Sequence, residues 1–238
     1  MITITASDLV KNSAHIGHKR HKTHAKVRNS LYKYESGVAL IDSFVTATQA
    51  NEAMEYLQKL GKSGKTLLVI GTKKVAKDIT KKTAKSVGAY YLTSKWISGT
   101  LTNFLEIKKN LEKIDQLTEE KTTNAYKDLP KHEQMAHDKL LAKLIRLYDG
   151  IVQMRSLPDA LFIVDAYKER NAISEAIKLG IPVVAISDTN ADPSRVQYPI
   201  IGNDDSASSV EFLVSKVLSA YKLTKSPETK EEKAVKSA

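Results

Sequence analysis

The chain has 238 residues, of which 42% are hydrophobic, so it can fold around a core and wholesale disorder is excluded. Its 37 Lys and Arg against 27 Asp and Glu give a formal net charge of +10, which favours nucleic acid or, second, an anionic membrane surface as partner. The absence of cysteine excludes disulfides and thiolate metal sites. Without a signal-peptide-like apolar segment or a run of about 18 apolar residues, we expect a soluble, intracellular protein.

A basic N-terminal arm, residues 1–36, opens the chain. Between Lys11 and Tyr34 it holds seven Lys or Arg, four His and no Asp or Glu. Because few apolar residues accompany these charges, we expect that the segment builds no core of its own and needs a polyanion or counterions to offset its self-repulsion. One reading is therefore an arm that lies against nucleic-acid phosphates. The other is a solvated basic loop, which is the commoner fate of an isolated charge run.

Residues 37–102 then alternate between strand and helix patterns. We expect a short strand at 38–41 and a helix at 46–60 that stops at Gly61. A strand at 66–70, a helix at 72–87 and a strand at 88–92 follow. The apolar run at 66–70 has no polar alternation, as expected for a parallel strand buried on both faces.

The pattern returns over residues 155–222. Strands are expected at 160–164, 182–186 and 198–201, and helices at 169–179 and 206–221. Strands that alternate with helices of this length indicate βαβ units with right-handed crossovers. We therefore predict an α/β domain, formed by residues 37–102 and 155–222, with a parallel sheet flanked by helices.

Residues 103–154 contain no strand pattern. Two sets of apolar residues are spaced 3-4-3: Phe104, Ile107, Leu111 and Ile114, and then Leu141, Leu144, Tyr148 and Ile151. Both sets are narrow seams among charged residues, which favours an antiparallel coiled-coil helical hairpin inserted into the α/β domain. Two ordinary helices packed on the sheet are the alternative. Beyond the last helix, the Lys- and Glu-rich residues 223–238 predict a disordered tail.

No pattern indicates catalysis. The segment Gly61-Lys-Ser-Gly64-Lys65-Thr66 resembles a phosphate-binding loop, but its glycines are too close and it precedes a strand, so we interpret it as a tight turn. Neither G-x-G-x-x-G after a strand nor G-x-S-x-G is present. A nucleotide-dependent α/β enzyme is the main alternative to a binding protein, since this topology hosts many enzymes. A basic membrane-surface adaptor is the second alternative.

The predicted helix 72–87 carries a stripe of lysines. Lys74, Lys77, Lys81, Lys82 and Lys85 fall on one side, with Val75, Ala76, Ile79, Thr83 and Val87 roughly opposite. If the apolar side packs on the sheet, the lysines point outward and contact phosphates. Lysines that are merely solvated are the alternative.

The only tryptophan, Trp96, follows Lys95 between a strand and the predicted hairpin. An anchor in the core or hairpin seam suits its large apolar area. The sharper alternative is stacking on a base or sugar, with Lys95 on a nearby phosphate.

A His-carboxylate metal site is a weaker hypothesis. His15 and His18 could combine with Asp188, Asp192, Asp204 and Asp205, which follow late strands. Doubly wound sheets gather ligands at the carboxyl ends of their strands, and zinc is the metal considered. The same segments are also typical of turns and helix N-caps, which need no metal.

Several sequence blocks together resemble those of one family. They are Ala14-His-Ile-Gly-His18, Gly71-Thr-Lys-Lys74, Lys95-Trp-Ile-Ser-Gly-Thr-Leu-Thr-Asn103, Leu157-Pro-Asp-Ala-Leu-Phe-Ile-Val-Asp165, Gly180-Ile-Pro-Val-Val-Ala-Ile-Ser-Asp-Thr-Asn190, Asp192-Pro193 and Ile201-Gly-Asn-Asp-Asp205. In this order they are similar to the bacterial small-subunit ribosomal protein S-two family, over roughly residues 8 to 222. The family's Arg before the tryptophan is Lys95 here, its Gly-Gly after the tryptophan is Ser98-Gly99, and the aromatic-rich stretch of its arm is replaced from Lys19 to Lys26.

The resemblance implies a flavodoxin-like α/β domain with a projecting coiled coil. It also implies a cytoplasmic structural protein that binds 16S ribosomal RNA between head and body of the small subunit, near the messenger exit. Neighbouring ribosomal proteins, the large S-one protein among them in many bacteria, are the implied partners, with no membrane and no small-molecule substrate. From the residues and the resemblance we expect RNA contacts at Lys19, Arg20, Lys22, Lys26, Arg28, Lys73, Lys74, Lys77, Lys81, Lys95 and Trp96.

Overall fold

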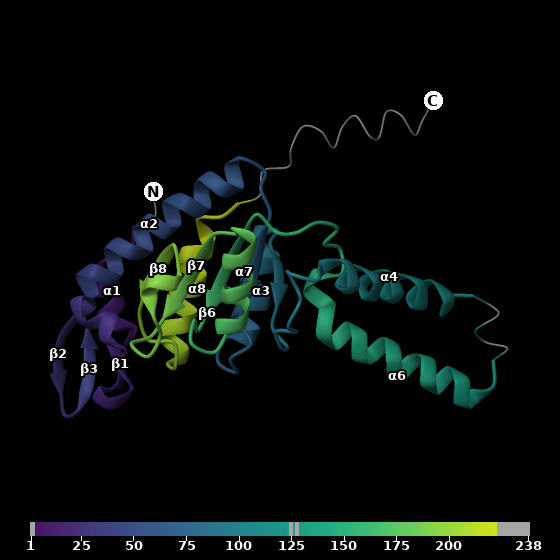
Figure 1. Ribbon diagram of the computed structural model, residues 1–238, viewed down its shortest axis with the longest axis horizontal. Helices are drawn as coiled ribbons and strands as arrows, with labels where there is room; N and C mark the ends of the chain where they lie inside the picture. Colours follow the sequence, from purple (N-terminus) through teal and green to yellow (C-terminus); the bar gives the residue numbers. More distant parts are fainter. Residues whose placement is uncertain (1–2, 124–125, 127–128, 223–238) are drawn as a thin grey trace.

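A five-stranded parallel sheet forms the centre of the computed structural model, which describes residues 3–123, 126 and 129–222 (Figure 1). Its strands are β4 (Leu67–Ile70), β5 (Tyr90–Leu92), β6 (Ala160–Val164), β7 (Val183–Ser187) and β8 (Tyr198–Ile201). They lie in the order β5-β4-β6-β7-β8, and every pairing is parallel. If these strands alone are counted along the chain, the order is 2-1-3-4-5, which is the flavodoxin-like order. The predicted α/β fold is confirmed.

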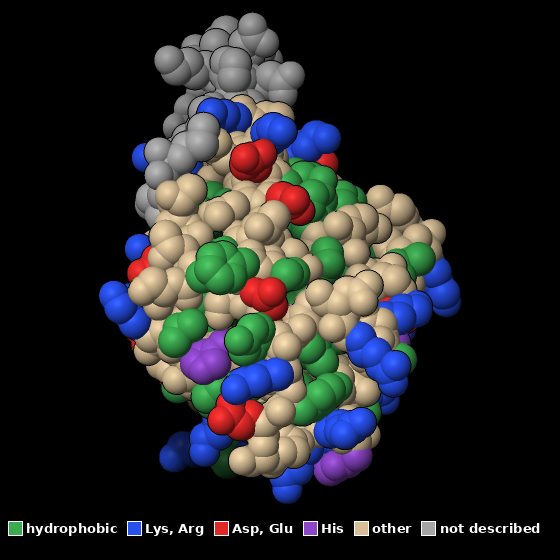
Figure 2. Space-filling model, turned by 90° about the vertical axis from the view of Figure 1, so that its left-hand side faces the viewer, with side chains coloured by type: hydrophobic (Ala, Val, Ile, Leu, Met, Phe, Trp, Pro, Cys, Tyr) green, Lys and Arg blue, Asp and Glu red, His purple; other side chains and the backbone are tan. Residues whose placement is uncertain are grey.

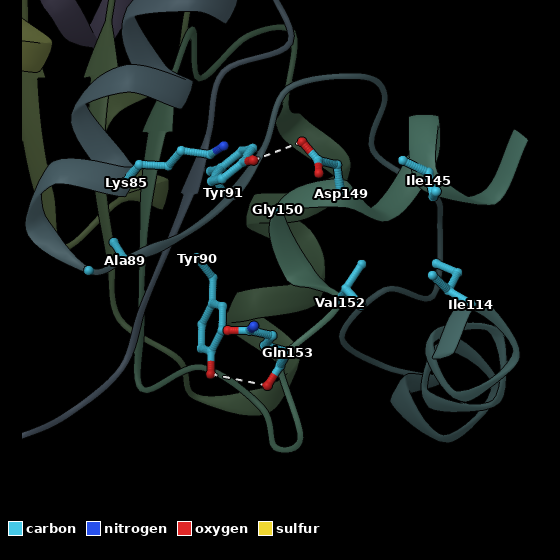
Figure 3. Close-up of a pocket in the computed structure, with 11 residues that line it drawn as sticks. Lys85, Ala89, Tyr90, Tyr91, Ile114, Ile145, Asp149, Gly150, Val152 and Gln153 are labelled. Carbon is cyan, nitrogen blue, oxygen red and sulfur yellow. Dashed lines mark hydrogen bonds between the residues drawn. The ribbon is translucent and has the colours of Figure 1, made fainter. Parts of the chain in front are cut away.

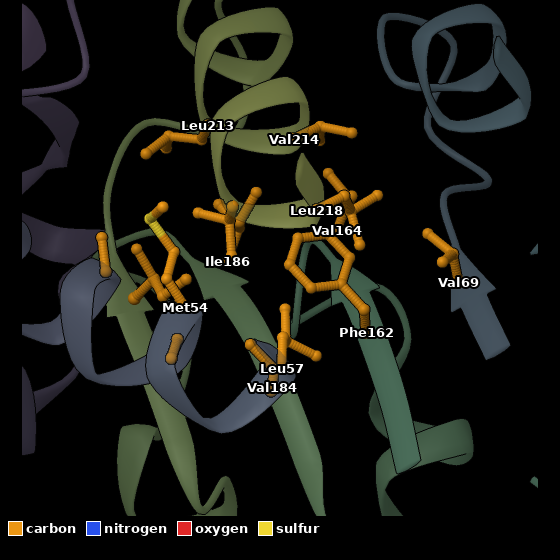
Figure 4. Close-up of a cluster of buried hydrophobic side chains, with 14 of the residues drawn as sticks. Met54, Leu57, Val69, Phe162, Val164, Val184, Ile186, Leu213, Val214 and Leu218 are labelled. Carbon is orange, nitrogen blue, oxygen red and sulfur yellow. The ribbon is translucent and has the colours of Figure 1, made fainter. Parts of the chain in front are cut away.

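Both faces of this sheet are covered, which explains why its strands show no polar alternation. Successive side chains of a strand point to opposite faces. Leu67 and Val69 accordingly belong to one buried cluster, and Leu68 and Ile70 to the other. In the first cluster Phe162 lies among side chains of two helices, including Leu57 and Leu218 (Figure 4).

The helices divide between the two faces. The first cluster draws on α2 (Ser43–Lys62), α3 (Lys77–Val87) and α8 (Ala207–Ser219). The second draws on α7 (Arg170–Leu179) and on the segment that follows β5. A short 3₁₀ turn, η4 (Pro193–Arg195), precedes β8. The segment from Gly61 to Thr66 is the last turn of α2 followed by a tight turn into β4, with Gly64 at φ +68°, and not a phosphate-binding loop.

The basic arm is folded. It contains α1 (Ala6–Lys11), β1 (Ile16–Lys19), η1 (Arg20–Lys22), η2 (Ala25–Ser30) and β2 (Leu31–Glu35). With β3 (Val38–Ile41) the two strands form an antiparallel sheet in the order β1-β3-β2, called the small sheet below. The predicted division after residue 36 falls within the β2–β3 hairpin. Val27 is buried against Ile41 and Ile201, so the arm shares its core with the α/β domain.

Two helices occupy the predicted insertion: α4 (Phe104–Glu120) and α6 (Lys131–Tyr148), which ends in η3 (Asp149–Ile151). They lie side by side and extend away from the sheet (Figure 1). Their buried residues are Ile107, Leu111, Ile114, Leu117, Leu141, Leu144 and Tyr148. The coiled-coil character of this pair stays a prediction. The predicted tail, 223–238, lies outside the described residues.

The largest error in a predicted helix boundary is at the start of α3, while α2 begins three residues earlier than predicted and includes Gly61. The helix predicted from residue 72 begins at Lys77, because residues 72–76 are held at the edge of the sheet. The Thr72 hydroxyl donates to Glu169, and Lys73 forms ion pairs with three aspartates. Val75, predicted to face the sheet, is 38% exposed in this turn. Among the described residues, no helix is both long and apolar enough to cross a membrane.

Candidate nucleic-acid interface

The arm presents its cations to solvent. All five arm residues predicted to contact RNA are exposed: Lys19, Arg20, Lys22, Lys26 and Arg28. Lys19 precedes η1, and the other four lie within η1 and η2. The only buried side chain of these two 3₁₀ turns is Val27, so their cationic side chains face outward. Figure 2 shows the end of the molecule that carries the small sheet, where Lys and Arg side chains gather over the lower part of the face. The fold therefore concentrates positive charge there.

Of the five arm residues predicted to contact RNA, Lys26 has an acidic partner in the α/β domain. Its Nζ lies 2.8 Å from Asp192 Oδ2 and 2.6 Å from the Ser194 hydroxyl. The hydrogen bond from Lys26, assisted by Ser194, lowers the pKa of Asp192 to about 2. Asp192 also caps η4 through the Ser194 amide, so this pair ties the arm to the loop before β8. Asp192 therefore neutralises part of the charge of Lys26 within the protein.

The lysines around α3 are unequal. Lys74, Lys82 and Lys85 are exposed, whereas Lys77 and Lys81 are half-buried. Lys74 precedes the helix, so it does not belong to the helical stripe. Lys81 pairs with Asp149 at 2.7 Å. The inward face is formed by Thr80, Thr83 and Ala84, which leaves a smaller cationic surface than the periodicity predicted.

Trp96 is an anchor. It is 7% exposed, and its indole Nε1 donates to Glu175 Oε1 at 3.0 Å. Stacking on a base is incompatible with this burial, whereas Lys95 is exposed and accessible to phosphate. We therefore remove Trp96 from the residues expected to contact RNA and keep Lys95 among them.

Glu175 was missed by the sequence analysis. It accepts hydrogen bonds from Trp96 and from the backbone N–H groups of Gly99, Leu101 and Thr102. Burial raises the pKa of Glu175, but these hydrogen bonds outweigh it and the pKa lies below its ordinary value of 4.5. The sequence does contain a signal for this role: Glu175 lies on the apolar face of α7, together with Ala172 and Ala176. A carboxylate buried on such a face needs hydrogen-bond donors.

Lys73 also differs from its prediction as an RNA contact. It follows β4 at the point where the strand order reverses, and its Nζ lies 2.5 Å from Asp204, 2.6 Å from Asp205 and 3.3 Å from Asp165. Burial lowers the pKa of Lys73, but the hydrogen bonds to Asp204 and Asp205 raise it above its ordinary value. The ammonium group is therefore charged and fully used inside the fold, and we remove Lys73 from the phosphate-binding set.

His18 brings the arm to the same edge. Its Nδ1 lies 3.1 Å from Asp188 Oδ2, and its Nε2 lies 3.5 Å from Asp205 Oδ2. The contact with Asp188 raises the pKa of His18, against the opposing effect of burial. The backbone N–H of His18 donates to the Thr189 hydroxyl at 2.9 Å. His18 thus links β1 to the loop that follows β7.

Three side chains around His18 lie close enough together to ligate one cation. One possible ligand atom from each of His18, Asp188 and Asp205 lies within 4.8 Å of the others. The side chain of Asp204 is only 1% exposed. Its Oδ1 accepts a hydrogen bond from Lys73, whereas its Oδ2 has no hydrogen-bond partner. Burial, with repulsion from Asp165 and Asp188, raises the pKa of Asp204 well above its ordinary value. Of the other candidates, His15 is not in this group, and Asp192 belongs to the Lys26 pair.

A pocket of about 530 Å³ lies between β5, the end of α3, η3 and the α4–α6 pair at Ile114 and Ile145 (Figure 3). Asp149 is its only carboxylate, and it accepts from the Tyr91 hydroxyl at 2.8 Å and from Lys81 at 2.7 Å. The hydrogen bond from Lys81 lowers the pKa of Asp149, so this group is a poor general base. Gly150 is required here, because a Cβ would lie 2.0 Å from the Tyr91 carbonyl oxygen. The geometry of this pocket gives the enzyme alternative no support.

The family model for ribosomal protein S2 matches residues 9–223. The small ribosomal subunit protein uS2 of Amoebophilus asiaticus (strain 5a2) is 39% identical over 214 residues, which cover 90% of this chain and 68% of that protein. The uS2 proteins of Dictyoglomus thermophilum and Dictyoglomus turgidum are each 37% identical over 220 residues, 92% of this chain and 89% of theirs. These matches extend over the arm, the inserted helices and both halves of the sheet. The chain belongs to the ribosomal protein S2 family.

Proposed function

We propose that the protein is a structural constituent of the small ribosomal subunit that binds 16S ribosomal RNA, and that it is not an enzyme. The observation that carries the proposal is the exposure of Lys19, Arg20, Lys22, Lys26 and Arg28 on an arm that is folded onto the sheet. An ordered surface with this charge suits the phosphate backbone of a folded RNA. The matching relatives are named as small-subunit proteins, which supports the same conclusion.

Contacts to phosphate carry the binding in this proposal. Outside the arm, Lys74, Lys77, Lys81 and Lys95 are further phosphate contacts in this proposal, while Lys73 and Trp96 hold the fold together. Recognition depends on RNA shape and backbone, because side chains cannot read the narrow major groove of an A-form helix. We place the protein in the cytoplasm, between head and body of the subunit near the messenger exit.

The partners in this proposal include neighbouring small-subunit proteins. The α4–α6 pair extends away from the sheet and offers a long surface to RNA or to a neighbouring protein (Figure 1). The large S-one protein is a further partner in organisms that have one.

Co-sedimentation of the full-length protein with small subunits, followed by crosslink mapping, tests this function. The double reversal Lys22→Glu and Arg28→Glu should weaken incorporation while circular dichroism stays unchanged. The charge reversal Lys59→Glu and Lys62→Glu is the matched control. Both lysines are exposed and lie at the C-terminal end of α2. Crosslinks that avoid the arm, or normal incorporation of the arm variant, would remove the arm from the interface.

We also propose that His18, Asp188, Asp204 and Asp205 hold one divalent cation such as Zn²⁺. Each aspartate has one carboxylate oxygen engaged elsewhere: Oδ1 of Asp188 accepts from the Thr189 amide, and Oδ1 of Asp204 and Asp205 from Lys73. The remaining oxygens lie toward His18 or have no hydrogen-bond partner. Imidazole and carboxylate ligands together suit zinc.

Elemental analysis after dialysis against Zn²⁺ tests the cation site. One equivalent is expected in the unmodified protein and a loss in His18→Asn and Asp188→Asn. His21→Asn, at an exposed position in the same arm, should keep the metal. If the unmodified protein retains no zinc, a protonated His18 between Asp188 and Asp205 accounts for the geometry instead.

A further inference from the structure

Two tyrosines of the small sheet are exposed. Tyr32 is 72% exposed and Tyr34 is 39% exposed, and both lie on β2. This strand pairs with β3 alone in the order β1-β3-β2, so it forms an edge of the small sheet. Large aromatic rings on an open sheet surface are a common platform for unpaired bases.

Each ring has a cation beside it. The Arg20 guanidinium lies 5.3 Å from the centre of the Tyr34 ring, and Lys33 Nζ lies 5.9 Å from the centre of the Tyr32 ring. Glu35 is the acidic residue of this strand, and its carboxylate is paired with Lys33 at 3.1 Å. Lys19 and Lys22 flank Arg20 and are exposed. The patch therefore offers aromatic faces and positive charge together.

We propose that β2 binds unpaired nucleotides of RNA, with Tyr32 and Tyr34 stacked on bases and with Arg20 and Lys33 on the adjoining phosphates. The positive surroundings favour RNA over an apolar protein segment as occupant, because a phosphate backbone offsets their charge. The bases must be unpaired, since in a duplex their faces are already stacked on one another. The proposal rests on the proposed function and adds the class of RNA element that this part of the arm recognises.

Fluorescence anisotropy with a labelled ten-nucleotide oligouridylate and an abasic oligomer of the same length tests the stacking. The two oligomers carry the same phosphates, so any preference for the first reports base contacts. The full-length protein should bind the oligouridylate at least about 25-fold more tightly, about 5-fold for each of the two rings. Tyr32→Ala and Tyr34→Ala should each weaken binding of the oligouridylate by roughly 5- to 150-fold and leave binding of the abasic oligomer unchanged.

Tyr167→Ala is the matched control. Tyr167 is 54% exposed and also has an arginine beside its ring, Arg170 at 5.9 Å, but it lies after β6 and outside the arm. This variant should bind both oligomers as the unmodified protein does, and Tyr32→Phe should keep the preference for bases. Crosslinking of the unmodified protein to 4-thiouridine RNA needs no variant and should label Tyr32 or Tyr34.

The outcomes separate the two proposals. Equal affinity for the two oligomers would overturn the stacking and leave phosphate binding standing. Failure to bind either oligomer at low salt would count against the RNA-binding function itself, and the stacking would fall with it. If the tyrosine variants bind both oligomers normally but lose a neighbouring protein during subunit reconstitution, the patch is a protein-docking surface and the stacking proposal is wrong.

Discussion

The indole Nε1 of Trp96 donates to Glu175 Oε1 at 3.0 Å, and this bond fastens the segment after β5 to α7. The same carboxylate accepts from the backbone of Gly99, Leu101 and Thr102. This segment leads directly into α4, which begins at Phe104. Glu175 therefore sets the position from which the inserted helices leave the sheet. An accurate position matters if the insertion contacts a neighbour in an assembly.

Replacing Glu175 with Gln should destabilise the fold. The amide keeps the shape of the side chain, but its NH₂ group faces an N–H donor where a carboxylate oxygen accepted before. A loss of about 1–3 kcal/mol in the free energy of unfolding is expected, as for a buried donor left without an acceptor. Urea denaturation followed by Trp96 fluorescence measures it. Glu211→Gln, at an exposed position of α8, is the control and should change stability by less than about 0.5 kcal/mol.

The contribution of Glu175 should depend on pH in one direction. Its pKa in the folded protein lies below the ordinary 4.5, so the carboxylate stabilises the fold above that value. This stabilisation is lost as the pH falls through the lower, folded-state pKa. The difference in unfolding free energy between the unmodified protein and Glu175→Gln should therefore shrink below about pH 4.5. A difference that stays constant from pH 7 to pH 3 would show that the charge is not what matters.

Much of the fold follows from local sequence patterns, but these patterns do not predict the contacts of Lys73 and Glu175. Strand β6 occupies the predicted residues. A short, continuous run of apolar residues is typical of a parallel strand that is buried on both faces of a sheet. The start of α3 was wrong because helical periodicity runs through residues 72–76, and nothing local shows that Lys73 pairs with Asp204, 131 positions later. Glu175 was missed for the same reason. Contacts that join distant segments decide these positions.

Binding of the protein to 16S RNA should weaken steeply with salt. If about six phosphates are neutralised, the affinity should fall by roughly three decades between 50 and 200 mM salt. Lys22→Ala should lower the slope of log affinity against log salt by about 1, because Lys22 is exposed and forms no ion pair within the part of the chain that the structure describes. Filter binding over a salt series measures both. A complex that is insensitive to salt would contradict phosphate contacts as the source of affinity.

Lys73 should matter for stability and not for RNA affinity. Its side chain is 19% exposed and lies against Asp165, Asp204 and Asp205, so Lys73→Met leaves these carboxylates without their cation. A loss on the order of 3 kcal/mol in the free energy of unfolding is expected. Lys74→Met, one residue along and exposed, should change it by less than about 0.5 kcal/mol. Urea denaturation in buffer with EDTA makes the comparison without bound metal.

A second substitution shows whether repulsion is the cause. Adding Asp205→Asn to Lys73→Met removes one of the charges left unpaired, so the double variant should recover part of the lost stability. The salt slope of RNA binding should be the same for Lys73→Met and the unmodified protein, because this ammonium group already has its anions within the fold. A lower slope for Lys73→Met would return Lys73 to the phosphate-binding surface.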